Sequence, residues 1–476
     1  MPTLYRRGLR YRQHVAEAGK RNGPAGAGGG ADAIERYSKL FAERTRTMTS
    51  SAMRDLMAFT ERPDVISLAG GLPDTSTFPR DSYASLMGRI AAGELAKALQ
   101  YGPTEGLAIA RESIREVMAA ESISVDPDDV IVTTGGQQVL DLVCKILINP
   151  GDVIIAEGPT YPGAVSAFTS YEARVEQVPV DGDGIDVELL RERLSELDAE
   201  GVVPKLLYLI PNFQNPSGVT LSVERRRQVV AIASERNLLI LEDNPYGLLR
   251  YEGEQLPSLK ELDSDDLVIY LGTFSKILSP GIRLGWVTAP RPVLEKLNLA
   301  KQAADLCASS LAQHFVSAYV AGGGWPEYIA SLRKIYRTRR DAMLESLASE
   351  MPEGTTWTRP EGGLFLWATL PDCIDTTDLL ARALRENFAF VPGRAAWVNG
   401  DGGSSMRLNF SGATEDEIRE GIRRLGVIAG EQVDLFNTMT GKRPSKPAAS
   451  SSTLSTGGRV VPFTPAEPPA AADGGA

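Results

Sequence analysis

The chain has 476 residues, of which 43% are hydrophobic and 23% charged, a composition typical of a globular enzyme with room for two domains. A formal net charge of -11 argues against a nucleic-acid-binding surface, which needs clustered basic residues. No window offers the roughly 20 uninterrupted apolar residues of a membrane span. From the charge and from this absence, neither a nucleic acid nor a membrane is expected as a partner.

Histidine and cysteine are scarce, which narrows the chemistry. His14 lies in an irregular arm, and no triad or zinc motif surrounds His314, so a packed helical histidine is the favoured interpretation of the latter. Acid–base work must therefore come from lysine, aspartate, glutamate or tyrosine, and no metal site is expected. Cys144, Cys307 and Cys373 lie far apart without a C-x-x-C pair, which favours a reducing, cytoplasmic location.

Both ends of the chain are predicted to be disordered, because they have too few apolar residues to form a core. The N-terminal arm is Arg-rich and then Gly/Ala-rich, and it has no apolar stretch of the kind found in a secretory signal. The C-terminal end is rich in Ser, Pro and Ala.

Between the ends, short apolar runs alternate with helical patterns. The predicted strands are 130–134, 153–157, 205–211, 238–243, 267–273 and 284–289, and the predicted helices are 137–148, 187–197, 223–235 and 291–304. This order predicts an α/β fold with a doubly wound, mostly parallel sheet. A later long helix, with strands at 364–369 and 406–410, predicts a smaller α+β domain.

Ligands of such sheets bind beyond the carboxyl ends of the strands, so the residues after each predicted strand are the candidates. The first strand ends in Thr133-Thr-Gly-Gly-Gln-Gln, where two glycines and a helix N-terminus could cradle a phosphate; a tight turn without a ligand has the same pattern. Asn215-Pro-Ser-Gly follows the third strand and could be only a turn.

Two charged residues follow the next strands. Asp243, in Glu242-Asp-Asn-Pro-Tyr, ends an apolar run, so it either caps a loop or forms an ion pair with a protonated heterocycle. Lys276, in Thr273-Phe-Ser-Lys-Ile-Leu-Ser-Pro-Gly-Ile-Arg283, comes directly after the fifth strand. Partial burial would lower its pKa and free the amine for Schiff-base formation. A lone lysine would be assigned to the surface, but one that follows the other three motifs in this order is not.

The order of the four motifs resembles that of fold-type I, pyridoxal 5′-phosphate (PLP)-dependent aminotransferases of class I/II, over about residues 40 to 430. The resemblance implies that Lys276 holds PLP as a Schiff base and then acts as the base between Cα and C4′. Asp243 would pair with the pyridine nitrogen, while Tyr246 and Asn215 would hydrogen-bond the phenolic oxygen.

The resemblance also assigns the rest of the cofactor site. The residues implied to bind PLP, mainly at its phosphate, are Gly135, Gly136, Gln137, Thr273, Ser275 and Arg283. Tyr161, in Glu157-Gly-Pro-Thr-Tyr, matches the aromatic residue that stacks on the ring. Tyr101, in Tyr101-Gly-Pro-Thr-Glu-Gly, matches a tyrosine that reaches the phosphate of the neighbouring subunit, which implies a homodimer with shared active sites.

On the substrate side, Arg407, in Met406-Arg-Leu-Asn-Phe, matches the arginine that binds the α-carboxylate, next to Asn215. Ser51-Ala-Met-Arg54 and Ser67-Leu-Ala-Gly-Gly71 are similar to the 2-aminoadipate and kynurenine aminotransferase branch. There the glycine pair lies beside the substrate, and Arg54 would contact the distal carboxylate of an acidic substrate; a surface arginine on an amphipathic helix is the other interpretation.

The predicted parts are therefore a disordered arm at 1–35, a segment covering the active site at 36–75, a large PLP-binding domain at 76–322, a small C-terminal domain at 323–430 and a disordered tail at 431–476. The expected reaction moves an amino group between an L-amino acid and a 2-oxo acid. Glutamate/2-oxoglutarate is the expected first pair, and 2-aminoadipate, a branched-chain or an aromatic amino acid belongs to the second.

Two other functions fit parts of the sequence. The same lysine would serve another PLP enzyme, such as a lyase, a decarboxylase or a cyclase of secondary metabolism. A PLP-sensing transcriptional regulator would need a basic, ordered DNA-binding domain before the fold, whereas only a short Gly-rich arm precedes it here.

Overall fold

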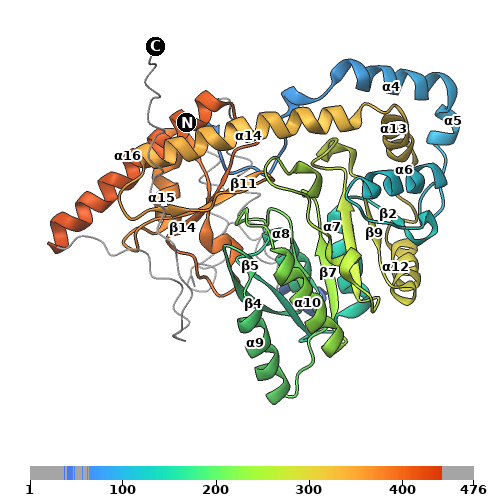
Figure 1. Ribbon diagram of the computed structural model, residues 1–476, viewed down its shortest axis with the longest axis horizontal. Coiled ribbons are helices and arrows are strands. Elements are labelled where there is room, and N and C mark those ends of the chain that lie inside the picture. The colour runs from blue at the N-terminus through green and yellow to red at the C-terminus, as the bar shows by residue number, and fades with distance from the viewer. Residues whose placement is uncertain are drawn as a thin grey trace, which may run out of the picture.

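The computed structural model describes residues 64–441, together with Tyr37, 40–46, Met48, Leu56 and Arg62. The predicted N-terminal arm, Arg54 and the chain beyond residue 441 lie outside the described residues. Within the described part, a large sheet with helices on both faces lies beside a smaller sheet flanked by long helices (Figure 1).

The large sheet has eight strands in the order β2-β9-β8-β7-β6-β3-β4-β5. They are β2 (Ile131–Thr133), β3 (Val153–Gly158), β4 (Arg174–Asp181), β5 (Gly184–Ile185), β6 (Leu206–Leu209), β7 (Leu239–Asp243), β8 (Val268–Thr273) and β9 (Gly285–Thr288). The pairs from β8 through β4 are parallel, whereas β9 is antiparallel to both neighbours and β5 to β4. The mostly parallel α/β sheet is confirmed, and β4 and β5 add two strands to the six that the sequence predicts.

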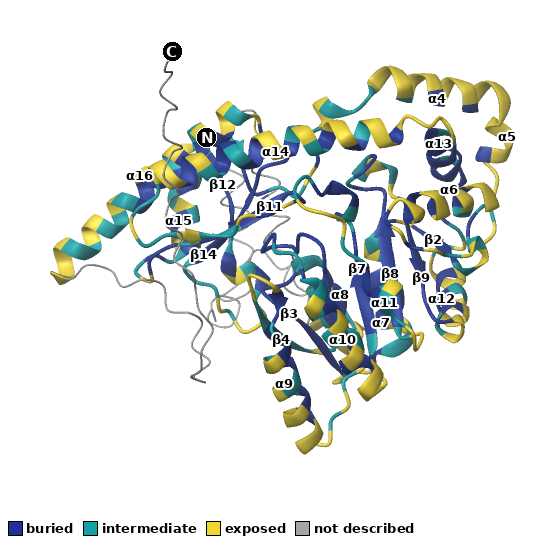
Figure 2. Ribbon diagram, viewed as in Figure 1, coloured by how far each residue is buried: buried dark blue, intermediate teal, exposed yellow. Residues whose placement is uncertain are grey.

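Helices cover both faces because the central strands are apolar on both sides. In β6, Leu206 and Tyr208 belong to the core shared with α7 and α8, whereas Leu207 and Leu209 face α9 and α10. The first face is covered by α6 (Ala108–Ala119), α7 (Gly136–Leu147), α8 (Pro162–Ser170), α12 (Arg291–Ala304) and α13 (Ser310–Ala321), and the second by α9 (Val187–Ala199), α10 (Val223–Arg236) and α11 (Leu259–Leu262). Figure 2 shows the strands dark blue between helices with yellow outer faces.

The smaller sheet is antiparallel, in the order β10-β11-β14-β13. Its strands are β10 (Thr356–Trp357), β11 (Phe365–Thr369), β13 (Val391–Pro392) and β14 (Ser405–Asn409), with the helices α14 (Trp325–Glu350), α15 (Thr376–Ala383) and α16 (Glu415–Thr440). In Figure 1, α14 runs along one side of the molecule from the large sheet to the small one. These elements agree with the α+β domain predicted after residue 322.

The segment before the large sheet is tied to both parts. Its strand β1 (Ile66–Ser67) pairs in parallel with β12 (Phe388–Ala389), and α4 (Arg80–Gly93) and α5 (Leu95–Ala98) then lead to α6. The described residues also form short 3-10 helices, which are Glu43–Arg46, Thr75–Thr77, Pro127–Asp129, Gly247–Leu249, Pro280–Ile282, Leu384–Glu386 and Gly393–Ala396. None of the described helices is long and apolar enough to cross a membrane.

One predicted boundary needs correction. Helix α16 starts at a capping box, in which Thr414 and Glu417 satisfy each other's backbone N–H groups, and it ends where Gly441 takes a left-handed conformation. The tail predicted to begin at 431 therefore starts inside this helix. The apolar face of α16, with Ile418, Ile422 and Leu425, packs into the core, and this burial stabilises the helix.

Candidate active site

The register of the large sheet brings the glycine motif and the lysine motif together. Thr133 at the end of β2 pairs with Gly285 on β9, and Gly285 pairs in turn with Thr273 at the end of β8. A Cβ on Gly285 would lie 2.9 Å from the backbone nitrogen of Gly136, so only glycine allows the two motifs to approach this closely. The segment Thr134–Gln137, here called the glycine loop, therefore lies over the start of the Thr273–Arg283 segment.

The glycine loop and Arg283 form an anion cradle. Gly135 has a φ of +75° and precedes helix α7, whose N-terminus has no side-chain cap. The Arg283 guanidinium donates from Nη2 to the Thr134 carbonyl at 3.4 Å, and a Cβ on Gly135 would lie 2.6 Å from that same nitrogen. Free N–H groups at a helix start and an adjacent guanidinium both favour a bound anion.

The hydroxyl groups of the lysine motif contact each other at the end of β8, the strand end that pairs with Gly285. Thr273 donates from Oγ1 to Ser275 Oγ at 2.9 Å, and it accepts from the backbone N–H of Ser275 at 3.2 Å. Gln137, by contrast, is exposed and donates to the Gly163 carbonyl at 3.0 Å. Among the described residues no carboxylate forms an ion pair with Arg283, so the cradle has the charge and the donors that a phosphate group needs.

Asp243 is directed into the site by strand alternation. Glu242 and Asp243 point to opposite faces of β7, and Glu242 accepts the N–H groups of Leu259 and Lys260 at the start of α11. Asp243 instead accepts a hydrogen bond at Oδ2 from the Tyr208 hydroxyl, at 2.7 Å. Burial raises the pKa of Asp243 to about 6, although the Tyr208 hydrogen bond and the Lys276 charge oppose this. A buried carboxylate of this kind is stabilised by a cationic partner.

Lys276 follows β8, the strand next to β7, and its amine lies inside the protein. Its Nζ donates to the carbonyl of Gly71 at 2.6 Å. Burial, and then the charges of Arg407 and Arg283, lower the pKa of Lys276 to about 8, while Asp243 acts in the opposite direction. An amine with this pKa has a substantial neutral, nucleophilic fraction near neutral pH.

Arg407 comes from β14 of the small sheet and completes the site. It donates to Asn215 Oδ1 at 3.0 Å and to the Ala69 carbonyl at 2.7 Å, and its guanidinium lies 4.4 Å from the centroid of the Phe365 ring. Burial lowers its pKa to about 10, so it remains charged. Burial and then the Asp243 charge raise the pKa of the Tyr246 phenol, whereas Arg407 and Asn215 oppose this rise, so the phenol lies close to both.

The other predicted residues are placed as follows. The Tyr161 ring folds over Gly163, and its pKa is raised by burial and then by the nearby Asp243 charge. Tyr101 is 79% exposed and makes no part of this single-chain site. Gly71 contributes its carbonyl, and a Cβ there would lie 3.2 Å from the tip of the Phe365 ring. Arg54 lies outside the described residues.

Several residues of the site were not predicted. Tyr208 lies inside β6, and its only signal was one hydroxyl in an apolar run. Glu157 lies near the end of β3 and accepts the Ile210 N–H at 2.9 Å. Burial raises the pKa of Glu157 to about 8, so its neutral acid form is favoured beside Asp243. Phe365 supports both Arg407 and Tyr246 from β11.

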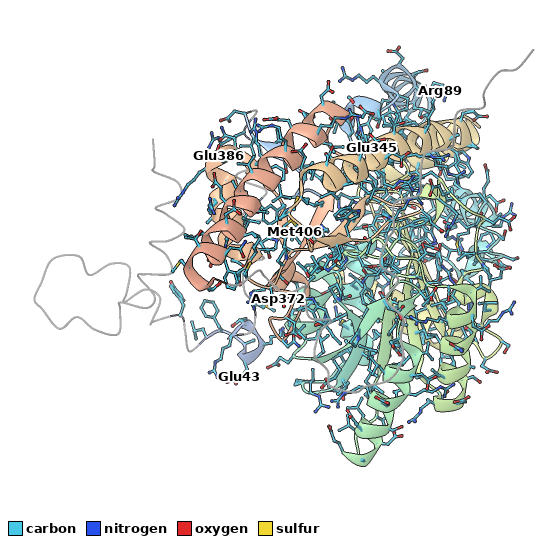
Figure 3. All side chains as sticks on the ribbon, turned by 60° about the vertical axis from the view of Figure 1, so that its left-hand side comes forward. Glu43, Arg89, Glu345, Asp372, Glu386 and Met406 are labelled. Atoms are coloured by element: carbon cyan, nitrogen blue, oxygen red, sulfur yellow. The ribbon has the colours of Figure 1, made fainter. Side chains whose placement is uncertain are left out.

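A surface depression between α14 and α16, lined by residues such as Glu345 and Arg419, lies apart from these side chains. Figure 3 labels Glu345 and also Met406, the residue before Arg407 on β14, and the two lie apart in that view. The chemistry is therefore expected at the edge of the large sheet and not in the depression.

Comparison with known proteins decides the family. The family model of aminotransferase class I and II matches residues 63–425. The chain belongs to the class I and II aminotransferases.

Named relatives agree with this assignment. Aromatic-amino-acid aminotransferase 1 of Thermococcus litoralis is 45% identical over 398 residues, which are 83% of this chain and 95% of that protein. The crystal structure of Pyrococcus horikoshii kynurenine aminotransferase matches with a TM-score of 0.80 and 42% identity, over 84% of this chain and 99% of that one. The α-aminoadipate aminotransferase of Thermus thermophilus, solved with N-(5'-phosphopyridoxyl)-L-leucine, matches with a TM-score of 0.78 and 38% identity, over 84% and 99% of the two chains.

The cofactor of this aminotransferase is PLP, and the residues of the site fit it. The glycine loop leaves no space for a Cβ beside Arg283, as a close phosphate site requires. The buried amine of Lys276 suits an aldehyde, and the buried carboxylate of Asp243 suits a protonated ring nitrogen. The site thus has two ends: the cofactor end on the large sheet, and the end at Arg407, here called the carboxylate end because a substrate carboxylate is expected to bind there.

Proposed function

We propose that this aminotransferase moves an amino group between glutamate/2-oxoglutarate and an aromatic amino acid with its 2-oxo acid. The observation that supports the site assignment is that Lys276 Nζ, which donates to Gly71, lies close enough to Asp243 and Arg407 for their charges to act on its pKa. The choice of an aromatic second substrate rests on the names of the Thermococcus litoralis and Pyrococcus horikoshii relatives. 2-Aminoadipate and branched-chain amino acids are the alternatives, supported by the Thermus thermophilus relative and its leucine adduct.

The carboxylate end supplies substrate recognition. Arg407 binds the α-carboxylate in a bidentate manner, and this anion replaces the Ala69 carbonyl as the partner of Nη2. Asn215 Oδ1 accepts a hydrogen bond from the other guanidinium nitrogen, Nη1, at 3.0 Å, and the Phe365 ring lies against the guanidinium. These contacts orient the substrate so that its Cα lies toward Lys276.

The cofactor end supplies the chemistry. PLP, when bound, accepts the electrons that are released from the substrate Cα. Lys276 Nζ is the base that takes the Cα proton, and its lowered pKa of about 8 makes the neutral amine accessible for this task. Asp243 keeps a negative charge at the end of β7, where Tyr208 fixes the orientation of its carboxylate.

The phosphate contacts and the second subunit complete the proposal. The glycine loop, Gln137, Thr273, Ser275 and Arg283 hold the phosphate, and Tyr161 stacks on the ring. The exposure of Tyr101 supports a role in the active site of a second copy, and so a homodimer with shared sites. Cys144, Cys307 and Cys373 are all free thiols, in agreement with a cytoplasmic enzyme.

The test is a set of half-reactions with the purified holoenzyme. Each amino acid is added without an acceptor, and loss of the visible cofactor absorption is followed over time. Glutamate and an aromatic amino acid are expected to react fastest. When 2-oxoglutarate is then added to the enzyme that has reacted with the aromatic amino acid, the glutamate formed should equal the aromatic 2-oxo acid already released, in a 1:1 ratio.

The alternatives give other results in the same assay. Faster reaction of 2-aminoadipate or leucine would replace the aromatic substrate with that class. Ammonia or carbon dioxide release without a matching amount of glutamate would overturn transamination as the main reaction.

A further inference from the structure

A carboxylate distant in sequence contacts the start of the glycine loop. Asp305 lies just after α12, and its Oδ2 accepts hydrogen bonds from Thr134 Oγ1 at 3.0 Å and from Gln138 Nε2 at 2.7 Å. Gln138 in turn accepts the backbone N–H of Thr134 at 2.8 Å. Asp305, Gln138 and Thr134 therefore form a closed ring of three hydrogen bonds around the start of the glycine loop.

The carboxylate itself is held in place. Lys301, one turn earlier on α12, donates from Nζ to Asp305 Oδ1 at 2.6 Å, and the lysine side chain is fully buried. Burial disfavours the charged form of Asp305, but the hydrogen bonds from Lys301, Gln138 and Thr134 outweigh this and hold its pKa below the usual value. Each oxygen of the carboxylate thus has a donor, and the group is fixed to α12.

The glycine loop needs such external support. Helix α7 has no side-chain cap, and Gly135 adds no side-chain contact of its own. The other side-chain contacts of this turn are the Thr133 hydroxyl on the Gly135 carbonyl, at 3.1 Å, the exposed Gln137 on the Gly163 carbonyl, at 3.0 Å, and the long contact from Arg283 to Thr134. A loop that must present free N–H groups to an anion gains affinity when its conformation is fixed beforehand.

We infer that Asp305 is a positioning residue that holds the glycine loop in the conformation that binds the phosphate of PLP. It acts through Thr134 and Gln138 and does not touch the cofactor. This inference rests on the proposed role of the glycine loop, and it adds Asp305, a residue that lies outside every motif of the sequence.

The test uses two variants that leave the Asp305–Lys301 pair intact. Thr134→Val and Gln138→Met each remove one donor to Asp305 and keep the side-chain volume similar. The apoenzyme of each is titrated with PLP, and the thermal unfolding temperature of the apoenzyme is measured in parallel. Each variant is expected to raise the Kd for PLP by about tenfold or more, the size of a lost hydrogen bond to a charged group, with unfolding temperatures near the wild-type value.

Coupling and a matched control sharpen the result. In Asp305→Asn, adding Gln138→Met should raise the Kd by much less than it does in the wild-type background, because both changes break the same ring. Asp129→Asn is the control, since it removes an exposed ion pair to Arg291 on the same helix without touching the glycine loop. It should leave the Kd unchanged.

The outcomes separate this inference from the proposed function. Wild-type PLP affinity in both Thr134→Val and Gln138→Met would overturn the role of Asp305. A variant that lacks the Arg283 side chain and binds PLP as well as the wild-type protein does would instead overturn the phosphate assignment of the loop itself. If Asp305→Asn does not fold, the first two variants still decide the question.

Discussion

The cofactor end and the carboxylate end of the site are supported in different ways. At the cofactor end, sheet register and side-chain hydrogen bonds fix the glycine loop, Asp243 and Tyr208. At the carboxylate end, Arg407 and Lys276 donate to the carbonyls of Ala69 and Gly71. Those carbonyls belong to a connecting segment, and a substrate carboxylate is a stronger acceptor for a guanidinium than a carbonyl. The comparison teaches that side-chain contacts fix the cofactor end, whereas the carboxylate end has backbone contacts that we expect a substrate to replace.

The largest expected effect comes from the residue that serves both ends. Lys276→Ala should lower kcat by at least about 10⁴-fold, because the base and the covalent attachment of the cofactor are lost together. A coupled assay for glutamate formation measures this. Lys296→Ala, an exposed lysine on α12, is the control and should retain wild-type kcat. Near wild-type turnover in Lys276→Ala would contradict the site assignment.

A change at the carboxylate end alone should separate substrate from cofactor. Arg407→Lys is expected to lower kcat/KM by about 10- to 100-fold, because an ammonium cannot reproduce the bidentate contact. The Kd for PLP should stay the same. Arg340→Lys serves as the control, since Arg340 is also buried and lies over an aromatic ring, that of Tyr251, outside the site. A parallel rise in the Kd for PLP would show that the two ends are not independent.

A change at the cofactor end alone should do the reverse. Gly135→Ala is expected to weaken PLP binding by about tenfold or more, because alanine disfavours a φ of +75° and its Cβ would meet Arg283. Titration of the apoenzyme measures the Kd. Gly151→Ala is the matched control, since Gly151 also has a positive φ, of +86°, but open space around it. Equal effects of the two variants would mean that backbone strain, and not the cradle, is responsible.

The smallest expected effect is a shift in pH dependence. The Tyr208 hydrogen bond lowers the pKa of Asp243, so Tyr208→Phe should raise that pKa above its value of about 6. Because the carboxylate is the active form, the acid limb of kcat/KM should move to higher pH, by up to about one unit. Rates from pH 5 to 9 measure it. Tyr171→Phe, which removes a hydrogen bond to Asp141 outside the site, should leave the profile in place.

The sequence predicts the central fold well and its edge poorly. Strand β7 was expected at 238–243 and spans Leu239–Asp243, because a continuous apolar run has few other interpretations in this context. Strands β4 and β5 were missed, because β4 is only half-buried and alternates charged with apolar residues near the sheet edge. Local sequence says little about such a strand until its neighbour β3 is placed.

The site shows the same limit. Asp243, Lys276 and Arg407 were found because each lies in a motif of contiguous residues, and the structure brings the charges of Asp243 and Arg407 close to Lys276. Their individual roles remain predictions. Asp305 was missed because its link to Thr134 spans 171 residues. The carbonyls of Ala69 and Gly71 were missed because every residue has a backbone carbonyl, so the sequence does not mark the ones that accept a side-chain hydrogen bond.

The pairing of β1 with β12 has a consequence for any rotation of the two sheets against each other. Leu68 and Ala69 are attached to the smaller sheet, since the Asn409 N–H donates to the Leu68 carbonyl at 2.8 Å and Arg407 holds Ala69. Lys276, in contrast, is attached to the larger sheet. A rotation of one sheet against the other would carry Arg407 and Ala69 together and would stretch the bond between Lys276 and Gly71. This bond and the one between Arg407 and Asn215 are places where a spectroscopic or isotopic probe would register a relative motion of the two halves.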